Sequence, residues 1–527
     1  MSDFALNRFY SYAEVEQLLF ALRDAHPDIC TLEALAKTNE GRTIWGVTLA
    51  ANCTEEDTPD MRPAFYVQGG LHAEEGMGIT GSLALLHAMT ENPEYRKQLE
   101  TVTVYILPCI NPDGSNACVT TGVAVRSMLE RLPEDTPNAL IPQDLDGDGK
   151  VLTMRWEDPT GLWKADPECG DLLVQRVPGD TEGPFYHVCT EGMFQNYDGS
   201  GNIHNMRNLD MNRMFAGDWK DTPNGGDYPG RHVEPRTVME FLLTHPNIFA
   251  AFDIHCGTRA LIFDLPGNQA DATVMRKVMR LGKEITGIDP VSEGNYGRGQ
   301  DAKATVLPGV FRGYMQDTFG LIGATVELGN GWNSVGLTSR EIWDAPDGIM
   351  VKEFLSRIIA LHDAHGSKIA APWVKYNHPQ LGEVEIGGHI QGNAYFMLAD
   401  DMLEILPKVT VFLREMMLWH PKLELVNVKA DALGSDVVRV RADVINTGKL
   451  GTTVLKGATG FHARYPLRLQ ISGAEEVLSR GNVKEFPGLD ALESQKAEWF
   501  VRAKAGTTLT VTATHPKGGV AKVNITV

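Results

Sequence analysis

Polar side chains that could do chemistry follow, or lie within, four apolar segments of this 527-residue sequence. They are His72 and Glu75 after residues 62–70, Asn111 after 101–110, His255 at the end of 247–255, and Glu327 within 321–329. Histidine and carboxylate side chains are zinc ligands, and a catalytic zinc ion keeps one position open for water. Zinc lowers the pKa of that water to about 7, and a glutamate that is not a ligand can then act as general base. The set predicts metal-assisted attack of water on a carbonyl carbon.

The spacing of His72 and Glu75 allows both to touch one ion, because positions three apart share one side of a helical turn while Glu74 points elsewhere. Each residue alone also fits a simpler interpretation: a surface histidine beside an acidic helix start, a packed histidine, or a salt-bridged edge glutamate. An unpaired carboxylate near a buried strand is costly, or its pKa rises. Together, the residues favour a metal site held by His72, Glu75 and His255. Glu327 is then the candidate base.

The four segments are short and almost continuously apolar, which is typical of strands covered on both faces. Helix-like stretches such as 78–92 and 272–287 lie between them, and residues 11–25 have helical spacing behind Ser11 as N-cap. This alternation predicts an α/β fold, with a mostly parallel mixed sheet covered by helices on both faces. The functional crevice of such sheets lies outside the carboxyl ends of the strands. The polar strand ends should therefore converge there.

We expect three regions along the chain. Residues 1–365 form the α/β domain, with an insertion at about 115–246 that holds loops and small local structure. Residues 366–420 form a connecting segment with a helix. Residues 421–527 alternate apolar and polar residues between turn signals, which predicts an antiparallel β-sandwich.

The composition limits the classes of molecule that this protein is expected to bind. Lys and Arg number 48 against 68 Asp and Glu, a net charge of −20, which disfavours nucleic acid and anionic membranes because both are polyanions. No apolar run reaches the roughly 18–20 residues of a membrane span, and the first residues do not resemble a signal peptide. The seven cysteines form no CxxC pair, which fits reduced thiols in a cytoplasm better than disulfides. We expect a cytoplasmic protein without nucleic-acid or membrane partners, and leave the oligomeric state open.

The order of the motifs resembles that of the zinc carboxypeptidases of the carboxypeptidase A type, in a bacterial-like form with a large insertion and a C-terminal β domain. The resemblance covers roughly residues 8–360. The family's motifs are matched by G-G-x-H-A-x-E at 69–75, N-P-D-G at 111–114, F-D-I-H-C-G around His255 and T-V-E-L-G around Glu327. The resemblance implies a metallocarboxypeptidase with one Zn²⁺ per chain on His72, Glu75 and His255. Its substrate would be a peptide or small amide with a free carboxylate, and its catalytic glutamate would be Glu327.

Residues 210–213, D-x-N-R, resemble the family's substrate-binding motif. The resemblance implies that Asn212 and Arg213 hold the terminal carboxylate of the substrate, and that Asp210 orients a zinc histidine. The chemistry agrees, because an arginine fork binds carboxylate bidentately and carboxylates fix imidazole tautomers. A surface loop is the alternative for this motif taken alone.

The sequence departs from the family pattern in two places. Thr305 occupies the position of the family's tyrosine, Tyr314 lies further along and Tyr296 too far upstream, so that role is unassigned. The oxyanion-stabilising arginine should lie ahead of the Asn-Arg pair, but the insertion prevents simple counting. Arg155 is the first candidate for it and Arg207 the second.

Arg312 is a candidate for substrate selection. Counting back from Glu327 without gaps places it where these enzymes line the floor of the pocket for the terminal side chain. A buried cation there would favour substrates that end in Asp or Glu. An exposed arginine, or one paired with an acid such as Asp317, is the alternative.

D-L-D-G-D-G at 144–149 matches the opening of a calcium loop through Asp144, Asp146 and Asp148. Arg155 stands where the closing glutamate should be, so the loop is incomplete unless Glu157 or Asp158 closes it. An acidic turn without calcium is the alternative.

Two other functions fit the same residues. A deacylase of N-acyl amino acids resembling aspartoacylase, or an amidase that trims murein peptides, would use the same ligands and base. A binding protein that retains the zinc fold without turnover belongs to another class, and the intact Glu327 argues against it.

Overall fold

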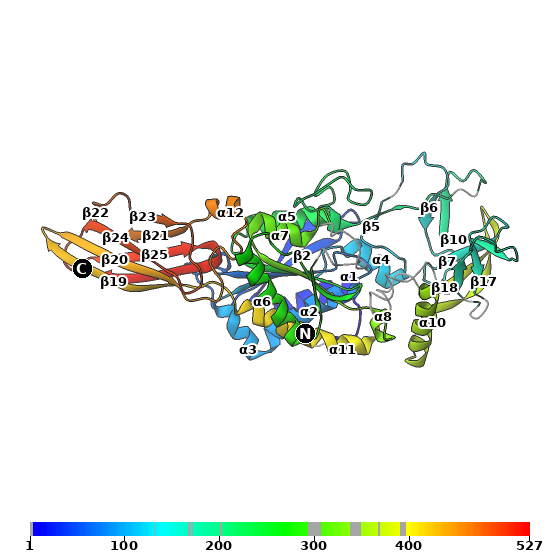
Figure 1. Cartoon of the computed structure of the whole chain (residues 1–527), viewed down its shortest axis with the longest axis horizontal. Helices are drawn as coiled ribbons and strands as arrows, with labels where there is room; N and C mark the ends of the chain where they lie inside the picture. Colours follow the sequence, from blue (N-terminus) through cyan, green and yellow to red (C-terminus); the bar gives the residue numbers. More distant parts are fainter. Residues whose placement is uncertain are drawn as a thin grey trace.

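The computed structural model describes residues 4–130, 132–166, 170, 172–200, 203–292, 307–337, 349–366, 369–389 and 397–527. The molecule is elongated, with an α/β body in the middle (Figure 1). The C-terminal strands form one end and the strands of the insertion form the other. Within the described ranges, none of the helices combines the length and apolar character needed to cross a membrane.

The body is built on an eight-stranded sheet of order β1-β2-β4-β3-β13-β16-β14-β15. In that order the strands are Cys30–Lys37, Thr43–Leu49, Thr103–Leu107, Ala64–Gly69, Ile248–His255, Ile322–Leu328, Arg259–Phe263 and Pro290–Ser292. Strands β4, β3, β13 and β16 are the four apolar segments of the sequence, and each runs parallel to the next. All of their residues are buried, which explains why apolar residues run through them without alternation. The predicted mixed, mostly parallel sheet is confirmed.

Helices cover both faces of this sheet. One core contains side chains of α1 (Tyr12–Ala25), α2 (Gly76–Glu91), α6 (Gln269–Thr286) and α11 (Ala399–Met417). The opposite core contains side chains of α5 (Val233–Thr244) and α7 (Phe311–Phe319). Strand β3 shows the division, because Phe65 and Val67 belong to the first core and Tyr66 to the second.

Four strands of the insertion join β17 and β18 of the later segment 366–420 in a six-stranded sheet of order β17-β18-β7-β10-β8-β9. Its strands are Ala370–His378, Gly382–His389, Thr153–Glu157, Phe185–Thr190, Trp163–Ala165 and Leu173–Gln175. The insertion also contains two two-stranded sheets, β6 (Ala139–Pro142) with β11 (Gly192–Gln195) and β5 (Met128–Glu130) with β12 (Arg207–Leu209). The remaining longer helices are α4 (Pro112–Thr121) and α10 (Ile349–Ala364).

The segment 366–420, expected as a connection, is shared between two parts of the molecule. Its strands β17 and β18 extend the insertion sheet, where Val384 and Ile386 share a core with Met154. Its helix α11 packs on α2 and α6 of the body. Burial of the apolar faces of these elements explains the difference, because a solvent-exposed connection would leave them in water.

The C-terminal region is the predicted antiparallel β-sandwich, and that prediction is confirmed. Its sheets have the orders β19-β20-β24-β22 and β23-β21-β25-β26. In those orders the strands are Leu423–Gly434, Val437–Asn446, Ser494–Arg502, Glu476–Val477, Val483–Phe486, Leu467–Ser472, Thr508–His515 and Gly519–Thr526. Alternate residues of β24 and β25 enter a core around the fully buried Trp499.

The sandwich is tied to the body by polar contacts at its edge. The carboxylate of Asp271 on α6 accepts hydrogen bonds from the backbone N–H groups of Lys456 and Gly457, at 2.9 and 3.0 Å. The buried ammonium of Lys517 donates to the backbone carbonyl of Phe319 in the body. Because these groups have left water, their pairing matters for the junction.

We predict that Asp271→Ala lowers the free energy of unfolding by about 2–3 kcal/mol, because two backbone N–H groups lose their acceptor and the first turn of α6 loses its negative charge. Urea unfolding followed by tryptophan fluorescence measures the change. Asp289→Ala is the matched control, because that exposed carboxylate pairs with Lys283 on the surface and should contribute less than about 1 kcal/mol. Equal losses in the two variants would contradict the assignment of the junction.

Candidate metal centre

Two glycines shape the loop that carries His72 and Glu75. Strand β3 ends at Gly69, where a Cβ atom would lie 2.2 Å from the carbonyl oxygen of Gly78. Gly70 follows with a φ of 66°, a left-handed conformation that disfavours other residues. The loop therefore packs tightly on the first turn of α2, which begins directly after Glu75.

Sheet register brings the other two candidate residues level with each other. His255 and Glu327 are partners in the parallel pairing of β13 with β16. Both lie on the face that α5 and α7 cover, whereas Cys256 belongs to the opposite core. This alternation turns the Cys256 side chain away from the metal site.

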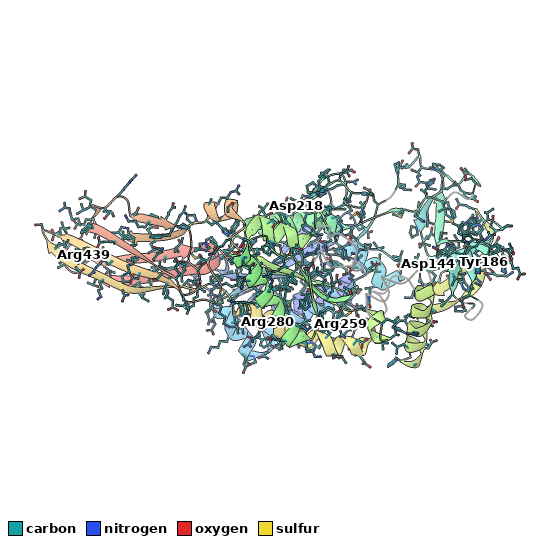
Figure 2. All side chains as sticks on the ribbon, viewed as in Figure 1. Asp144, Tyr186, Asp218, Arg259, Arg280 and Arg439 are labelled. Atoms are coloured by element: carbon teal, nitrogen blue, oxygen red, sulfur yellow. The ribbon has the colours of Figure 1, made fainter. Side chains whose placement is uncertain are left out.

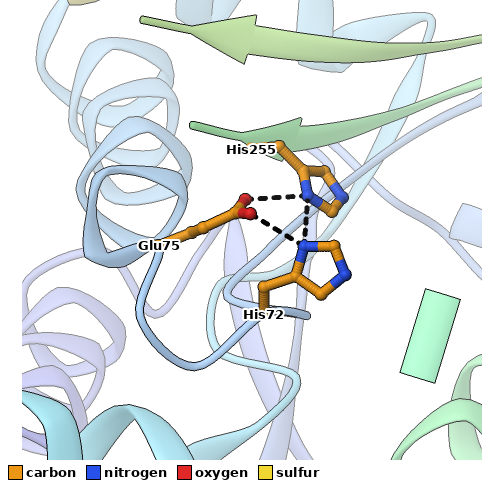
Figure 3. A group of neighbouring side chains, drawn as sticks. All are labelled: His72, Glu75 and His255. Carbon is orange, nitrogen blue, oxygen red and sulfur yellow. Dashed lines mark hydrogen bonds and ion pairs between the residues drawn. The ribbon is translucent and has the colours of Figure 1, made fainter. Parts of the chain in front are cut away.

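The structure brings His72, Glu75 and His255 together in a buried cluster (Figure 3). The Nδ1 atom of His72 lies 2.9 Å from Glu75 Oε1 and 3.0 Å from the Nδ1 atom of His255. The Nδ1 atom of His255 lies 2.8 Å from Glu75 Oε2. Two imidazole nitrogens and the carboxylate of Glu75, all able to donate lone pairs, thus face one point.

The cluster fits a zinc ion. A tetrahedral ion with bonds of about 2.0–2.1 Å spaces its ligand atoms about 3.4 Å apart. The observed spacing of 2.8–3.0 Å needs only a few tenths of an ångström of opening. The donor set of two imidazoles and one carboxylate leaves a fourth position open, as catalytic zinc sites do.

A carboxylate sits behind each histidine. The Nε2 atom of His72 lies 3.0 Å from Asp210 Oδ1, and the Nε2 atom of His255 lies 2.6 Å from Asp253 Oδ2. A proton held on Nε2 by these carboxylates leaves the Nδ1 lone pairs free to bind a metal.

Burial and charge set the pKa values in the cluster. Burial opposes the charge of Glu75, but the His72 and His255 rings hold its pKa well below the usual range. Burial also opposes the charge of His255, but Asp253 and Glu75 raise its pKa well above the usual value. The arrangement therefore stabilises positive charge between these side chains, whether it comes from protons or from a metal cation.

Glu327 is buried and one of its oxygens, Oε2, has no hydrogen-bond partner among the described residues. Burial, together with the negative charge of Glu75, raises the pKa of Glu327 to about 7. A carboxyl group that can both take and give a proton near neutral pH suits a general acid-base residue.

The D-x-N-R motif lies against the cluster through Asp210. Asp210 accepts the backbone N–H of Asn212 at 2.8 Å in addition to contacting His72. The side-chain oxygen of Asn212 accepts the N–H of Phe311 at 2.8 Å, which ties the motif to the start of α7. Nη1 of Arg213 donates to the backbone carbonyl of Asn212 at 2.7 Å and lies 3.7 Å from Asp210.

Arg155 does not reach this cluster, which corrects its assignment as the oxyanion arginine. It lies in β7 of the insertion sheet, where its Nε donates to Glu385 at 2.8 Å. Its guanidinium lies 4.5 Å from the ring of Tyr186 and 4.0 Å from that of Trp373. Tyr186 is in the lobe farthest from the sandwich (Figure 2). Pairing of β7 with β10 and β18 buries Arg155 as a packing residue.

Arg126, rather than Arg155, is an arginine that lies beside the metal cluster. Its Nη1 donates to Glu75 Oε1 at 2.8 Å, and its Nη2 lies 3.7 Å from Asp210. Its side chain is 32% exposed, so the guanidinium borders solvent. Sequence reasoning missed Arg126 because counting back from the Asn-Arg pair crosses the insertion. Its position shortly after the N-P-D-G turn was the usable signal.

Arg312 is buried in α7, and its Nε donates to Asp264 at 3.1 Å. Its carboxylate partner is therefore Asp264 rather than Asp317. The first turn of α7 also contacts Asn212, so Arg312 lies close to the D-x-N-R motif. Of the tyrosine candidates, Tyr314 is buried against Phe215 and Phe319. Tyr296 and Thr305 lie outside the described residues.

The expected calcium ligands only partly converge. Asp144 and Asp146 gather with the buried Glu191, which the sequence did not suggest, whereas Asp148 accepts the N–H of Lys150. Glu191 accepts the N–H groups of Leu145 and Leu152, and Asp144 those of Gly147 and Gly149. Glu157 and Asp158 do not join the group. These backbone bonds satisfy the carboxylates of an acidic turn, and no further support for calcium follows.

Comparison with known proteins gives two family matches. Residues 15–139 match the zinc carboxypeptidase family, and residues 422–526 match a domain of unknown function (DUF8731). Carboxypeptidase B of Astacus astacus is 26% identical over 179 residues, which cover 32% of this chain and 52% of that protein. Carboxypeptidase D of Rattus norvegicus is 30% identical over 119 residues, which cover 21% of this chain and 8% of that protein.

The structure of a metallo-carboxypeptidase from Burkholderia cenocepacia aligns with a TM-score of 0.36 and 15% identity over 77% of this chain and 70% of that chain. The buried His-Glu-His cluster at the carboxyl edge of this mixed α/β sheet could hold a single metal ion. The family match of residues 15–139 agrees with the motif resemblance to the zinc carboxypeptidases, and the aligned residues span only 8% of the rat protein and 52% of the Astacus protein. The matched segment holds His72, Glu75 and Arg126, whereas His255 and Glu327 lie beyond it.

For a metal-assisted hydrolysis at this cluster, we predict that Arg126→Ala lowers kcat/KM by 10²–10³-fold, about 3–4 kcal/mol of barrier. The reason is the loss of a positive group that borders the metal cluster. Peptide cleavage is measured by chromatography, alongside the zinc content of each protein. Arg155→Ala is the matched control and should leave kcat/KM of the folded protein unchanged. A larger loss in Arg155→Ala than in Arg126→Ala would overturn the reassignment.

Proposed function

We propose that this protein is a zinc-dependent exopeptidase that removes one residue from the free C-terminus of a peptide. The convergence of His72 Nδ1, Glu75 and His255 Nδ1 on one point beside Glu327 carries the proposal. The family match supports the same reaction class.

His72, Glu75 and His255 would hold the metal. Bound zinc would supply Lewis acidity toward the scissile carbonyl and lower the pKa of the attacking water. Glu327 takes the proton of that water and then delivers it to the leaving amine. Its buried position, with Oε2 unbonded among the described side chains, keeps the carboxylate ready for this transfer.

Arg213 and Asn212 would hold the terminal carboxylate of the substrate. A guanidinium has five N–H donors in a planar fork, and the contacts described for Arg213 use only Nη1. Asp210 connects this carboxylate-binding pair to the metal site, because it contacts both Arg213 and His72. Arg126 would stabilise the negative charge that develops on the carbonyl oxygen.

The cytoplasmic location remains a prediction from the pattern of cysteines. The described cysteines are free thiols, most of them buried, which fits a reducing compartment.

Glu327→Gln should bind one zinc ion per chain but lose at least 10³-fold in kcat, because the amide cannot accept the proton of water. His72→Ala should lose zinc, since one of three ligands is gone. Metal analysis and a panel of peptides, N-acyl amino acids and murein peptides test both variants against the wild type, with and without a chelator. Near-normal turnover by Glu327→Gln would rule out its role as base. Faster hydrolysis of N-acyl amino acids than of peptides would rule out the exopeptidase.

We further propose that Arg312 selects substrates with an acidic C-terminal residue. The carboxylate of Asp264 partly neutralises its guanidinium and so limits this preference. Wild-type protein should then cleave peptides ending in Glu faster than those ending in Leu or Lys. Arg312→Met should remove the preference, and Asp264→Asn should increase it by leaving the guanidinium less neutralised. The ratio of kcat/KM for Glu and Leu peptides is the measurement. Equal ratios in all three proteins would exclude Arg312 as a specificity residue.

A further inference from the structure

Asp253 is a buried carboxylate that the catalytic scheme above does not use. It lies two residues before His255 on β13, on the same face of the strand. Its Oδ2 atom is 2.6 Å from His255 Nε2, and its side chain is fully buried. Its other oxygen, Oδ1, has no hydrogen-bond partner among the described residues. The side chain therefore has one described polar contact, and that contact is the histidine.

The neighbours of Asp253 leave the His255 ring as its hydrogen-bond partner among the described residues. Its partners in the adjacent strands are Gln68 in β3 and Thr325 in β16, so the residues of this row are buried and neutral. The titratable group that faces Asp253 at hydrogen-bond distance is the ring of His255. A carboxylate so placed accepts a hydrogen bond from the Nε2–H group of that ring.

We propose that Asp253 is a positioning residue that fixes the tautomer and orientation of His255 for metal binding. Holding the proton on Nε2 leaves the lone pair of Nδ1 directed at the point that His72 and Glu75 also face. The negative charge of Asp253 also makes His255 a stronger donor to a cation. This inference rests on the metal site of the proposed function and extends it. Each histidine ligand is then backed by its own carboxylate, His72 by Asp210 and His255 by Asp253.

The test is the zinc affinity of Asp253→Asn, which keeps the shape of the side chain and removes its charge. Zinc-free protein is titrated in competition with a chromophoric chelator. We expect the affinity to fall by 10–100-fold relative to the wild type, together with an altered visible spectrum of the Co²⁺-loaded protein. Tyr66→Phe is the matched control: it removes a buried hydroxyl that donates to Gln68 on the same face and does not touch His255. Its affinity and spectrum should equal those of the wild type.

A second measurement needs only wild-type protein, and it decides the matter if Asp253→Asn does not fold. In the zinc-loaded protein, ¹⁵N–¹H NMR of the histidine rings should show a slowly exchanging, strongly deshielded proton on Nε2 of His255. The signal is assigned by its absence from His255→Gln. A ring proton on Nδ1, or an Asp253→Asn protein with unchanged zinc affinity and Co²⁺ spectrum, would overturn the inference. Failure of the wild type to bind zinc or to cleave peptides would instead overturn the proposed function.

Discussion

The proposed metal site depends on a local excess of lone pairs among three buried side chains. Two imidazole nitrogens and a carboxylate meet within 2.8–3.0 Å of one another, and all three side chains are buried. Without a cation between them, such groups must share protons or repel one another. A metal ion removes the conflict and turns the buried polar cluster into a source of folding energy. This geometry requires a glycine at position 69, the last residue of β3, and the observed register of β13. Either a Cβ atom at Gly69 or a shift of one residue in β13 would separate the ligands.

The carboxylates around the candidate metal site fall into two groups: Glu75, a candidate ligand, and two that contact the histidine ligands. Glu75 touches the site directly and is held by the backbone N–H of Cys256 and by Arg126. Asp210 and Asp253 lie behind the histidines. These three carboxylates outnumber the guanidinium groups of Arg126 and Arg213 that contact them, so the site as a whole attracts a cation. Burial, and after it the negative charge of Glu75, raises the pKa of Glu327 to about 7.

The sequence predicts the parts of this site that depend on strand ends and on short spacing. His72 and Glu75 follow from their three-residue spacing, and His255 and Glu327 follow from apolar runs that end at one sheet edge. Arg126 and Arg155 show where this reasoning stops. Both are arginines that follow short polar turns, and only the pairing of β7 with β18, strands more than two hundred residues apart, removes Arg155 from the site. Glu191 was missed for the same reason, because its approach to Asp144 depends on how the insertion folds.

The C-terminal sandwich and the insertion attach at opposite ends of the parallel strands. Their positions determine which of them can contact a substrate. The sandwich contacts the beginning of β16, where Leu455 donates its N–H to the carbonyl of Gly320 at 3.1 Å. The insertion leaves the body after α4, whose N-cap Asn111 follows β4 at the carboxyl edge, and rejoins it at Asp210 beside His72. A substrate that reaches Glu327 at the carboxyl end of β16 therefore meets the surroundings of the insertion, while the sandwich lies beyond the far edge of the sheet (Figure 1). Differences in substrate choice should accordingly reside in the insertion and in α7 rather than in the sandwich.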